Sequence, residues 1–303
     1  MMENTGIEAL QGNPNAPWIN QAIQTYGVAG NYFGVTHPSQ PNYIASTAGT
    51  TQGVPDDNDV TVNLPNIVDQ LEAKSHSWKG YMQSLSLCGG NKLAHACGNQ
   101  LYERKHNPFV SFADVQSSPA RMANVVDLSQ LDTDLADNTV PDYSWISPDQ
   151  CNDMHGRGGG GSSDPCNFSN VQLLIRAGDS FLSTYVGKIM ASKAWSGDSS
   201  IIITWDESDF TGSPTDFGFG DTRGCCDADP GGVEPRLPRI HLPHRERRAD
   251  ERPRRQRLAP SHGRGVDAPL PRFSFVQLRC ASAAARRRAG LARDHSGGRQ
   301  LLA

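Results

Sequence analysis

The chain has 303 residues, a formal net charge of −4 and a mean hydropathy of −0.52, which suit a soluble protein with one large domain or two small ones. No run in the sequence approaches the roughly 20 consecutive apolar residues of a membrane-spanning helix, so we expect no stable membrane insertion. The first residues, Met1-Met2-Glu3-Asn4, show neither the basic nor the apolar region of a secretory signal peptide.

The charge is divided unevenly along the chain. Residues 1–232 carry 26 acidic and 11 basic side chains, a net −15, whereas residues 233–303 carry 17 arginines, no lysine and six acidic side chains, a net +11. The second composition does not favour a packed core, so we predict a folded body over 1–232 and a disordered tail over 233–303. A GC-rich gene read in a shifted frame would produce such a tail; the alternative is a basic arm that binds nucleic acid or a membrane surface.

Apolar periodicity predicts alternating helices and strands in the body. It favours a short helix over residues 64–74 and strands over 78–82 and 142–147. A longer helix is expected over residues 170–189, where apolar residues recur at helical spacing. The continuously apolar stretch 201–205 that follows is typical of a strand covered on both faces.

A helix, a turn and a buried strand in succession indicate an α/β fold, with a mostly parallel central sheet sandwiched by helices. Ligands of such sheets gather at the carboxyl ends of the strands, where Asp206 and Glu207 follow the predicted strand 201–205. Two adjacent carboxylates repel each other unless a cation or a proton lies between them. The pair is therefore a candidate cation site; a helix cap or a surface salt bridge is the alternative.

A second candidate feature is the hydroxyl of Ser39. Pro38 and Pro41 flank it and restrict the backbone on both sides. We predict a helix from Asn42 onward, whose N-terminal amides would face an anion. A hydroxyl held there beside a metal ion is a plausible nucleophile, and an ordinary proline-rich turn is the alternative.

Two histidines lie in predicted polar loops. Lys105 and His106 are adjacent, and His155 follows Asp149 and Asp153 in a loop after the strand 142–147. A lone histidine in a loop is usually solvated. Two of them, beside an acidic pair and a constrained hydroxyl, favour a shared site instead.

The cysteines and glycines suggest loop structure. Cys88 with Cys97, and Cys151 with Cys166, close short loops that fit disulfides of a secreted protein. The alternative is reduced thiols in a cytosolic protein. The glycine-rich run 156–163 lacks the Gly-Lys-Ser/Thr ending of a phosphate-binding P-loop, so we expect a flexible surface loop.

Five motifs occur in chain order and together carry a resemblance. They are Met2-Glu3-Asn4, His37-Pro38-Ser39-Gln40-Pro41-Asn42-Tyr43, Lys105-His106-Asn107-Pro108-Phe109, Pro148-Asp149-Gln150-Cys151-Asn152-Asp153-Met154-His155 and Thr204-Trp205-Asp206-Glu207. Over about residues 2–230 the chain resembles the bacterial and fungal phosphoesterase family of secreted acid phosphatases and phosphatidylinositol phosphatases, to which larger phospholipases C are related. The resemblance implies the fold of the alkaline phosphatase superfamily and a secreted location.

The resemblance also implies roles. Ser39 corresponds to the nucleophile, whose oxygen also touches the metal. The other implied metal ligands are Glu3, Asn4, Asp206 and Glu207. The side chains implied to contact the phosphate or the leaving group are His106, His155 and Lys105.

These assignments make chemical sense. The implied ligands are hard oxygens, which favour Mg²⁺, Ca²⁺ or Mn²⁺, and Zn²⁺ also accepts such donors. The cation would activate Ser39 for attack on a phosphate monoester, a phosphoserine would form, and water would hydrolyse it. A histidine acting as the acid would favour mildly acidic pH. We expect a small phosphate ester or a phosphoinositide head group as substrate, and no nucleic-acid partner.

Two departures from the family pattern set further expectations. The apolar strand that precedes the Glu3-Asn4 pair in the family is missing, so we expect these two residues to lie on a frayed terminus. Residues 233–303 match neither the later core strand nor the later histidine motif, so we expect reduced stability and activity. The alternative functions are a phospholipase C-type phosphodiesterase and an inactive fragment whose arginine-rich tail binds nucleic acid.

Overall fold

The computed structural model describes residues 1–29, 32–196 and 198–208. Its helices are α1 (Ile7–Leu10), α2 (Pro17–Tyr26), α3 (Ser39–Ala48), α4 (Ile67–Ala73), α5 (Ala113–Gln116), α6 (Pro119–Ala123), α7 (Ser129–Asp137) and α8 (Val171–Ala191), with the 3-10 helices η1 (Leu85–Cys88), η2 (Arg104–His106) and η3 (Pro108–Ser111). Its strands are β1 (Trp78–Met82), β2 (Ala96–Cys97), β3 (Tyr102–Glu103), β4 (Val125–Asp127) and β5 (Tyr143–Ser147).

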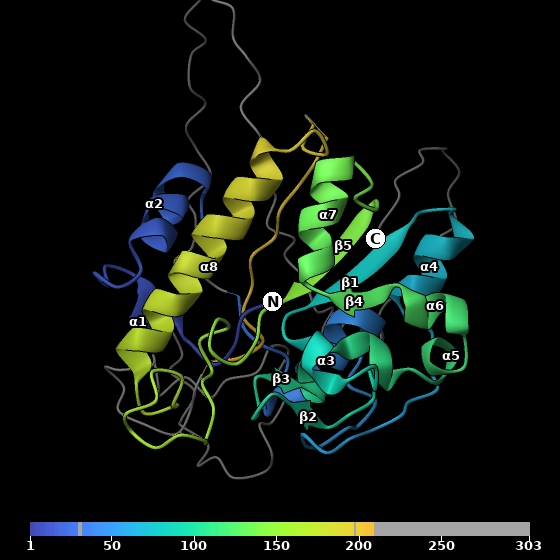
Figure 1. Ribbon diagram of the computed structural model, residues 1–303, viewed down its shortest axis with the longest axis horizontal. Helices are drawn as coiled ribbons and strands as arrows, with labels where there is room; N and C mark the ends of the chain where they lie inside the picture. The colour runs from blue at the N-terminus through green and yellow to red at the C-terminus, as the bar shows by residue number, and fades with distance from the viewer. Residues whose placement is uncertain (30–31, 197, 209–303) are drawn as a thin grey trace, which may run out of the picture.

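A parallel sheet of order β4-β1-β5 forms the centre (Figure 1). The predicted strands 78–82 and 142–147 are confirmed as β1 and β5, paired in register from Trp78 with Tyr143 to Met82 with Ser147. Strand β4 was not predicted, because three residues are too few to show a period. The short strands β2 and β3 form a separate antiparallel pair.

The N-terminal segment extends this sheet and is not frayed, which corrects the sequence-based expectation. The Met1 amine donates to the Ile146 carbonyl of β5 at 2.8 Å. On the other side, Met2 N donates to Thr204 O at 2.8 Å and Asp206 N donates to Met2 O at 3.1 Å. The segment is held because both of its edges are paired and because the Met2 side chain is buried.

The stretch 201–205 differs from the prediction of a strand covered on both faces. Only Trp205 forms a bridge within the described residues, to Met2. Ile203 and Trp205 pack on the hydrophobic core, whereas Ile202 is 49% exposed. Alternate side chains therefore face the core and the solvent, as in a strand with one buried face.

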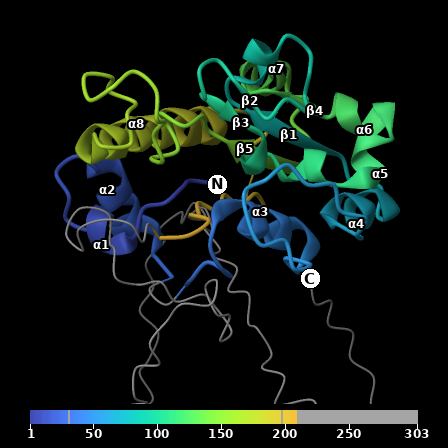
Figure 2. The same ribbon diagram turned by 90° about the horizontal axis from the view of Figure 1, so that it is seen from below.

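Two hydrophobic cores lie on the two faces of the sheet. On one face, Tyr81 packs with side chains from α1, α2, α7 and α8. On the other, Trp78 and Met82 pack with side chains from α3, α4, α5 and η3. Figure 2 shows α7 and α3 on opposite sides of the sheet. The predicted α/β class, with helices on both faces, is confirmed.

The predicted helices are present, with shifted ends. The helix expected over 64–74 is α4, which begins after Asn66 because that side chain caps it in a capping box with Asp69. The helix expected over 170–189 is α8. Within the described part of the chain, no helix is long and apolar enough to cross a membrane.

Both predicted disulfides are present, between Cys88 and Cys97 and between Cys151 and Cys166. Most of the glycine-rich run 156–163 is solvent-exposed, as expected of a surface loop. The predicted domain boundary at residue 232, the disorder expected of residues 233–303 and the nucleic-acid alternative all lie outside the described residues.

Candidate active site

The candidate site lies where the sheet strands end, at the start of α3. This helix begins at Ser39, not at Asn42 as predicted. Pro41 is compatible with the earlier start because the first amides of a helix have no partner within it. Ser39 is consequently the first residue of the helix, and its side chain is buried.

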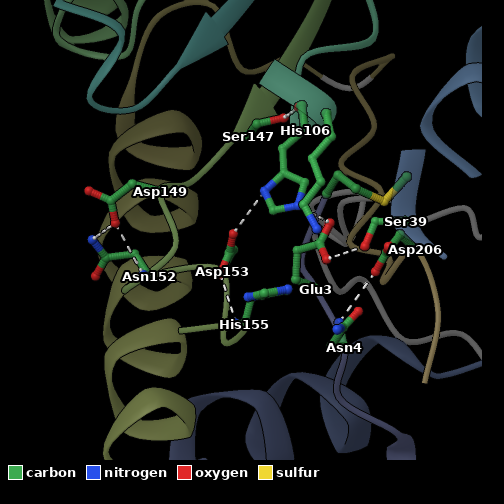
Figure 3. Close-up of polar contacts among 12 residues, drawn as sticks. Glu3, Asn4, Ser39, His106, Ser147, Asp149, Asn152, Asp153, His155 and Asp206 are labelled. Atoms are coloured by element: carbon green, nitrogen blue, oxygen red, sulfur yellow. Dashed lines mark hydrogen bonds and ion pairs between the residues drawn. The ribbon is translucent and has the colours of Figure 1, made fainter. Parts of the chain in front are cut away.

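The Ser39 hydroxyl meets carboxylates from both ends of the described chain. Its Oγ lies 3.1 Å from Glu3 Oε2 and 3.4 Å from Glu207 Oε1. Asn4 N donates to Asp206 Oδ1 at 3.3 Å. Figure 3 shows Glu3, Ser39 and Asp206 pointing toward one another. Met2 pairs with Trp205, so the residues that follow Met2 lie beside Asp206 and Glu207, which follow Trp205.

Four buried carboxyl groups share this small volume: Glu3, Asp153, Asp206 and Glu207. Burial, followed by repulsion between neighbouring acids, raises the pKa of Glu3, Asp153 and Asp206 well above the ordinary values. Such a cluster favours a bound cation or proton. His37 lies against the cluster, with its Nδ1 2.5 Å from Glu207 Oε2.

His106 is buried between two acids, not placed in a polar loop as the sequence suggested. Its Nε2 lies 3.2 Å from Glu3 Oε1 and its Nδ1 lies 3.4 Å from Asp153 Oδ2. Its ring stacks on Tyr43, with 5.3 Å between ring centroids. Burial, with the nearby charges of Lys105 and His155, lowers the pKa of His106 well below its usual range. The ring therefore lies between Glu3 and Asp153 and contacts both carboxyl groups.

His155 lies beside His106, with 5.7 Å between the ring centroids. Its Nδ1 lies 2.6 Å from the Gly156 carbonyl oxygen, which assigns the ring proton to Nδ1 and leaves Nε2 as an acceptor. Burial and the Lys105 charge lower the pKa of His155 to about 4. The imidazole is thus neutral over most of the pH range, unlike the acid of pKa near 6.5 that the sequence led us to expect.

Lys105 supplies a positive charge to the site. Its Nζ donates to Asp57 Oδ2 at 2.8 Å. Burial acts to lower the pKa of Lys105, but the charges of Glu3 and Asp57 outweigh it and raise the pKa to about 12. The ammonium group therefore stays protonated at neutral pH.

The structure thus brings the predicted residues together. Glu3, Asn4, Ser39, Asp206 and Glu207 converge, and His106, Lys105 and His155 lie around them.

Sequence reasoning missed roles for three other residues. His37 was noticed only as part of a motif. Tyr43, which hydrogen-bonds Glu3, looks like any aromatic residue of a helix. Asp57 lies in an acidic loop segment, where nothing in the sequence distinguishes it from its neighbours.

A family model described as "Phosphoesterase family" matches residues 11–244. The chain belongs to the Phosphoesterase family. The residues that converge in the site come from the motifs that carried this resemblance in the sequence.

Individual relatives share part of their length with this chain. It is 30% identical over 210 residues to a phosphatidylinositol-3-phosphatase of Mycobacterium tuberculosis, covering 68% of this chain and 61% of that protein. It is 30% identical over 212 residues to a phosphate-repressible acid phosphatase of Penicillium chrysogenum, covering 69% and 47%. It is 26% identical over 219 residues to a probable acid phosphatase of Kluyveromyces lactis, covering 70% and 47%. The chain spans about half the length of the curated relatives it matches.

Proposed function

We propose that this chain hydrolyses phosphate monoesters, with Ser39 as the nucleophile and a divalent cation bound beside it. One observation carries the proposal: the buried Ser39 hydroxyl lies 3.1 Å from Glu3 and 3.4 Å from Glu207, which stand at opposite ends of the described chain. A hydroxyl among acids is a poor nucleophile unless a cation offsets their charge. The acid phosphatases among the relatives support the same reaction class.

The residue types fit a hard divalent cation. One terminal atom of the Asn4 amide lies 3.3 Å from Glu3 Oε2 and 3.2 Å from Glu207 Oε1. Without a cation, that atom must be the nitrogen; with a cation between the three groups, the oxygen would fit there as a ligand. In the described residues, no group of three or more His, Cys, Asp or Glu side chains is arranged to hold a metal ion. We therefore propose a ligand set in which Asn4 and Ser39 join Glu3, Asp206 and Glu207.

The bound cation would lower the pKa of the Ser39 hydroxyl and offset charge on the phosphate oxygens. The chain's own groups do the rest. Lys105 stays charged and attracts the phosphoryl group. The His106 ring packs against Glu3, with Nε2 3.2 Å from Oε1. The position of Ser39 at the start of α3 directs the positive end of the helix dipole toward the phosphoryl group.

His155 is suited to the second half of the reaction. Because Nδ1 carries the ring proton and donates it to the Gly156 carbonyl oxygen, Nε2 of the neutral ring can accept a proton. We propose that His155 Nε2 accepts a proton from the water molecule that attacks the phosphoserine. This differs from the sequence-based hypothesis of a histidine acid, and it predicts that His155→Gln slows dephosphorylation more than it slows formation of the phosphoserine.

For the substrate, we propose a small phosphate ester or a phosphoinositide head group. The printed name of the mycobacterial relative supports the second. We propose a secreted location because the two disulfides suit an oxidising compartment.

The test is hydrolysis of p-nitrophenyl phosphate by the full chain. We expect a chelator to abolish turnover and added Mg²⁺, Ca²⁺, Mn²⁺ or Zn²⁺ to restore it. Ser39→Ala should lower kcat by more than about 10³-fold. Ser46→Ala is the matched control, because Ser46 is exposed on the same helix, and it should leave kcat unchanged. Turnover that survives Ser39→Ala would remove Ser39 as the nucleophile.

A further inference from the structure

A loop segment, residues 56–58, is fastened to the residue that follows Ser39. The backbone N of Gln40 donates to Asp57 Oδ1 at 2.9 Å. The Gln40 side-chain amide donates to Asp56 O at 3.3 Å and to Asn58 O at 2.5 Å. Gln40 is buried, so the bond from its backbone N to Asp57 replaces the water that a first-turn amide would otherwise bind, and the other two bonds satisfy its side-chain amide.

The second carboxylate oxygen of Asp57 binds Lys105. The Nζ to Oδ2 distance is 2.8 Å, and Asp57 is the sole described residue to which this ammonium group donates a hydrogen bond. One carboxylate therefore spans two groups that a phosphate would need: the first-turn backbone of the nucleophile helix and the nearby cation. An ammonium group has three donors, so the bond to Asp57 leaves two for a phosphoryl oxygen.

A lysine side chain is long and flexible, and it loses considerable conformational entropy when it is fixed. In the bond to Asp57 this loss precedes ligand binding. The same carboxylate fixes the start of α3, so that Lys105 and Ser39 keep one relative position. Preorganisation of this kind increases affinity because binding no longer has to order the side chain.

We propose that Asp57 is a positioning residue that holds Lys105 and the start of α3 in place for recognition of the phosphoryl group. This inference rests on the proposed function, because it takes the site to bind phosphate. Asp57 itself does not touch the reacting atoms.

Asp59 provides a matched control from the same loop. Its side chain is 35% exposed, against 33% for Asp57. It lies 3.4 Å from Arg104 Nη1, and Arg104 precedes Lys105 in the sequence. Asp59→Asn therefore removes one loop carboxylate together with its contacts to Arg104 and His95, and it removes no contact of Gln40 or Lys105.

The experiment measures the Kd of inorganic phosphate by calorimetry and the KM of p-nitrophenyl phosphate, with full-length variants. Asp57→Asn should weaken phosphate binding about tenfold or more, the loss of one charge-assisted hydrogen bond. Asp59→Asn should change it less than about twofold. Asp57→Glu, which keeps the charge, should recover part of the loss. In a Lys105→Met background, Asp57→Asn should cost less than it does in the wild type, because only its bond to Gln40 remains to be lost.

Three results would overturn the inference. Asp57→Asn could behave like Asp59→Asn, or its loss could multiply in full with that of Lys105→Met. It could also tighten phosphate binding, in which case the carboxylate competes with phosphate. Each is separable from failure of the proposed function, which would appear as absent wild-type turnover or as turnover that survives Ser39→Ala.

Discussion

At the scale of single residues, the site brings several buried ionisable side chains into contact. Glu3 is fully buried and contacts the Ser39 hydroxyl, the His106 ring and the Tyr43 side chain. Buried acids of this kind are costly unless they are neutralised. Here the Lys105 ammonium group offsets only part of the acid charge, because the pKa values of the neighbouring His106 and His155 rings are lowered, and the site therefore favours one more cation.

The low pKa of His155 makes stability depend on pH. The folded pKa of about 4 lies below the ordinary 6.5, so between these values the unfolded chain binds a proton that the folded chain does not. Stability should therefore fall as the pH is lowered through this window, by at most about 3 kcal/mol for this group. Urea unfolding of the wild type and His155→Gln should give curves that approach each other from pH 7 to pH 4. Parallel curves would contradict the buried, neutral imidazole.

Gly34 leaves room for the acidic pair. A Cβ atom at this position would lie 2.4 Å from the backbone oxygen of Asp206. Gly34→Ala should push Asp206 and Glu207 away from Ser39 and lower kcat about 10²-fold, because the proposed metal ligands would move by a fraction of an ångström or more. Gly187→Ala is the control: nothing lies within 4 Å of its Cβ, so it should raise stability by about 1 kcal/mol. Full activity of Gly34→Ala would contradict the proposed role of Asp206 and Glu207 beside Ser39.

At the scale of elements, the periodic segments could be predicted and the irregular ones could not. β1, β5 and α8 have enough residues for their apolar periods to appear in the sequence. β4 is too short. The start of α3 was predicted too late because a proline inside the first turn resembles a helix breaker, although the first turn tolerates it.

The disulfide between Cys151 and Cys166 fastens the loop that carries His155. Replacing both cysteines with serine should lower the unfolding free energy by about 3 kcal/mol, as expected for a loop of this length. It should also lower kcat, since the loop no longer holds His155. The control replaces Cys88 and Cys97, whose loop carries none of the assigned residues. Equal losses of kcat in the two double variants would show that the first disulfide has no special link to the site.

At the scale of the whole molecule, the site depends on pairing between distant segments. Met2 pairs with Trp205, and the acids that follow each of these two residues meet at Ser39. The motifs identified which residues meet, since five of them occur in the family order. They did not reveal the contacts made by residues to which the motifs gave no role. Examples are the contact of His37 with Glu207 and the bonds that Asp57 accepts from Gln40 and Lys105. Those contacts depend on loop paths, which have no periodic signal.

The measurement that tests the central claim most directly is to trap the phosphorylated protein. The wild type and His155→Gln would be quenched in acid during turnover of p-nitrophenyl phosphate with a divalent cation, and their peptides mapped by mass spectrometry. We predict one phosphoryl group on Ser39, with a larger fraction in His155→Gln because its dephosphorylation is slower. Turnover with the phosphoryl group on a histidine, or on no residue in either protein, would contradict the account.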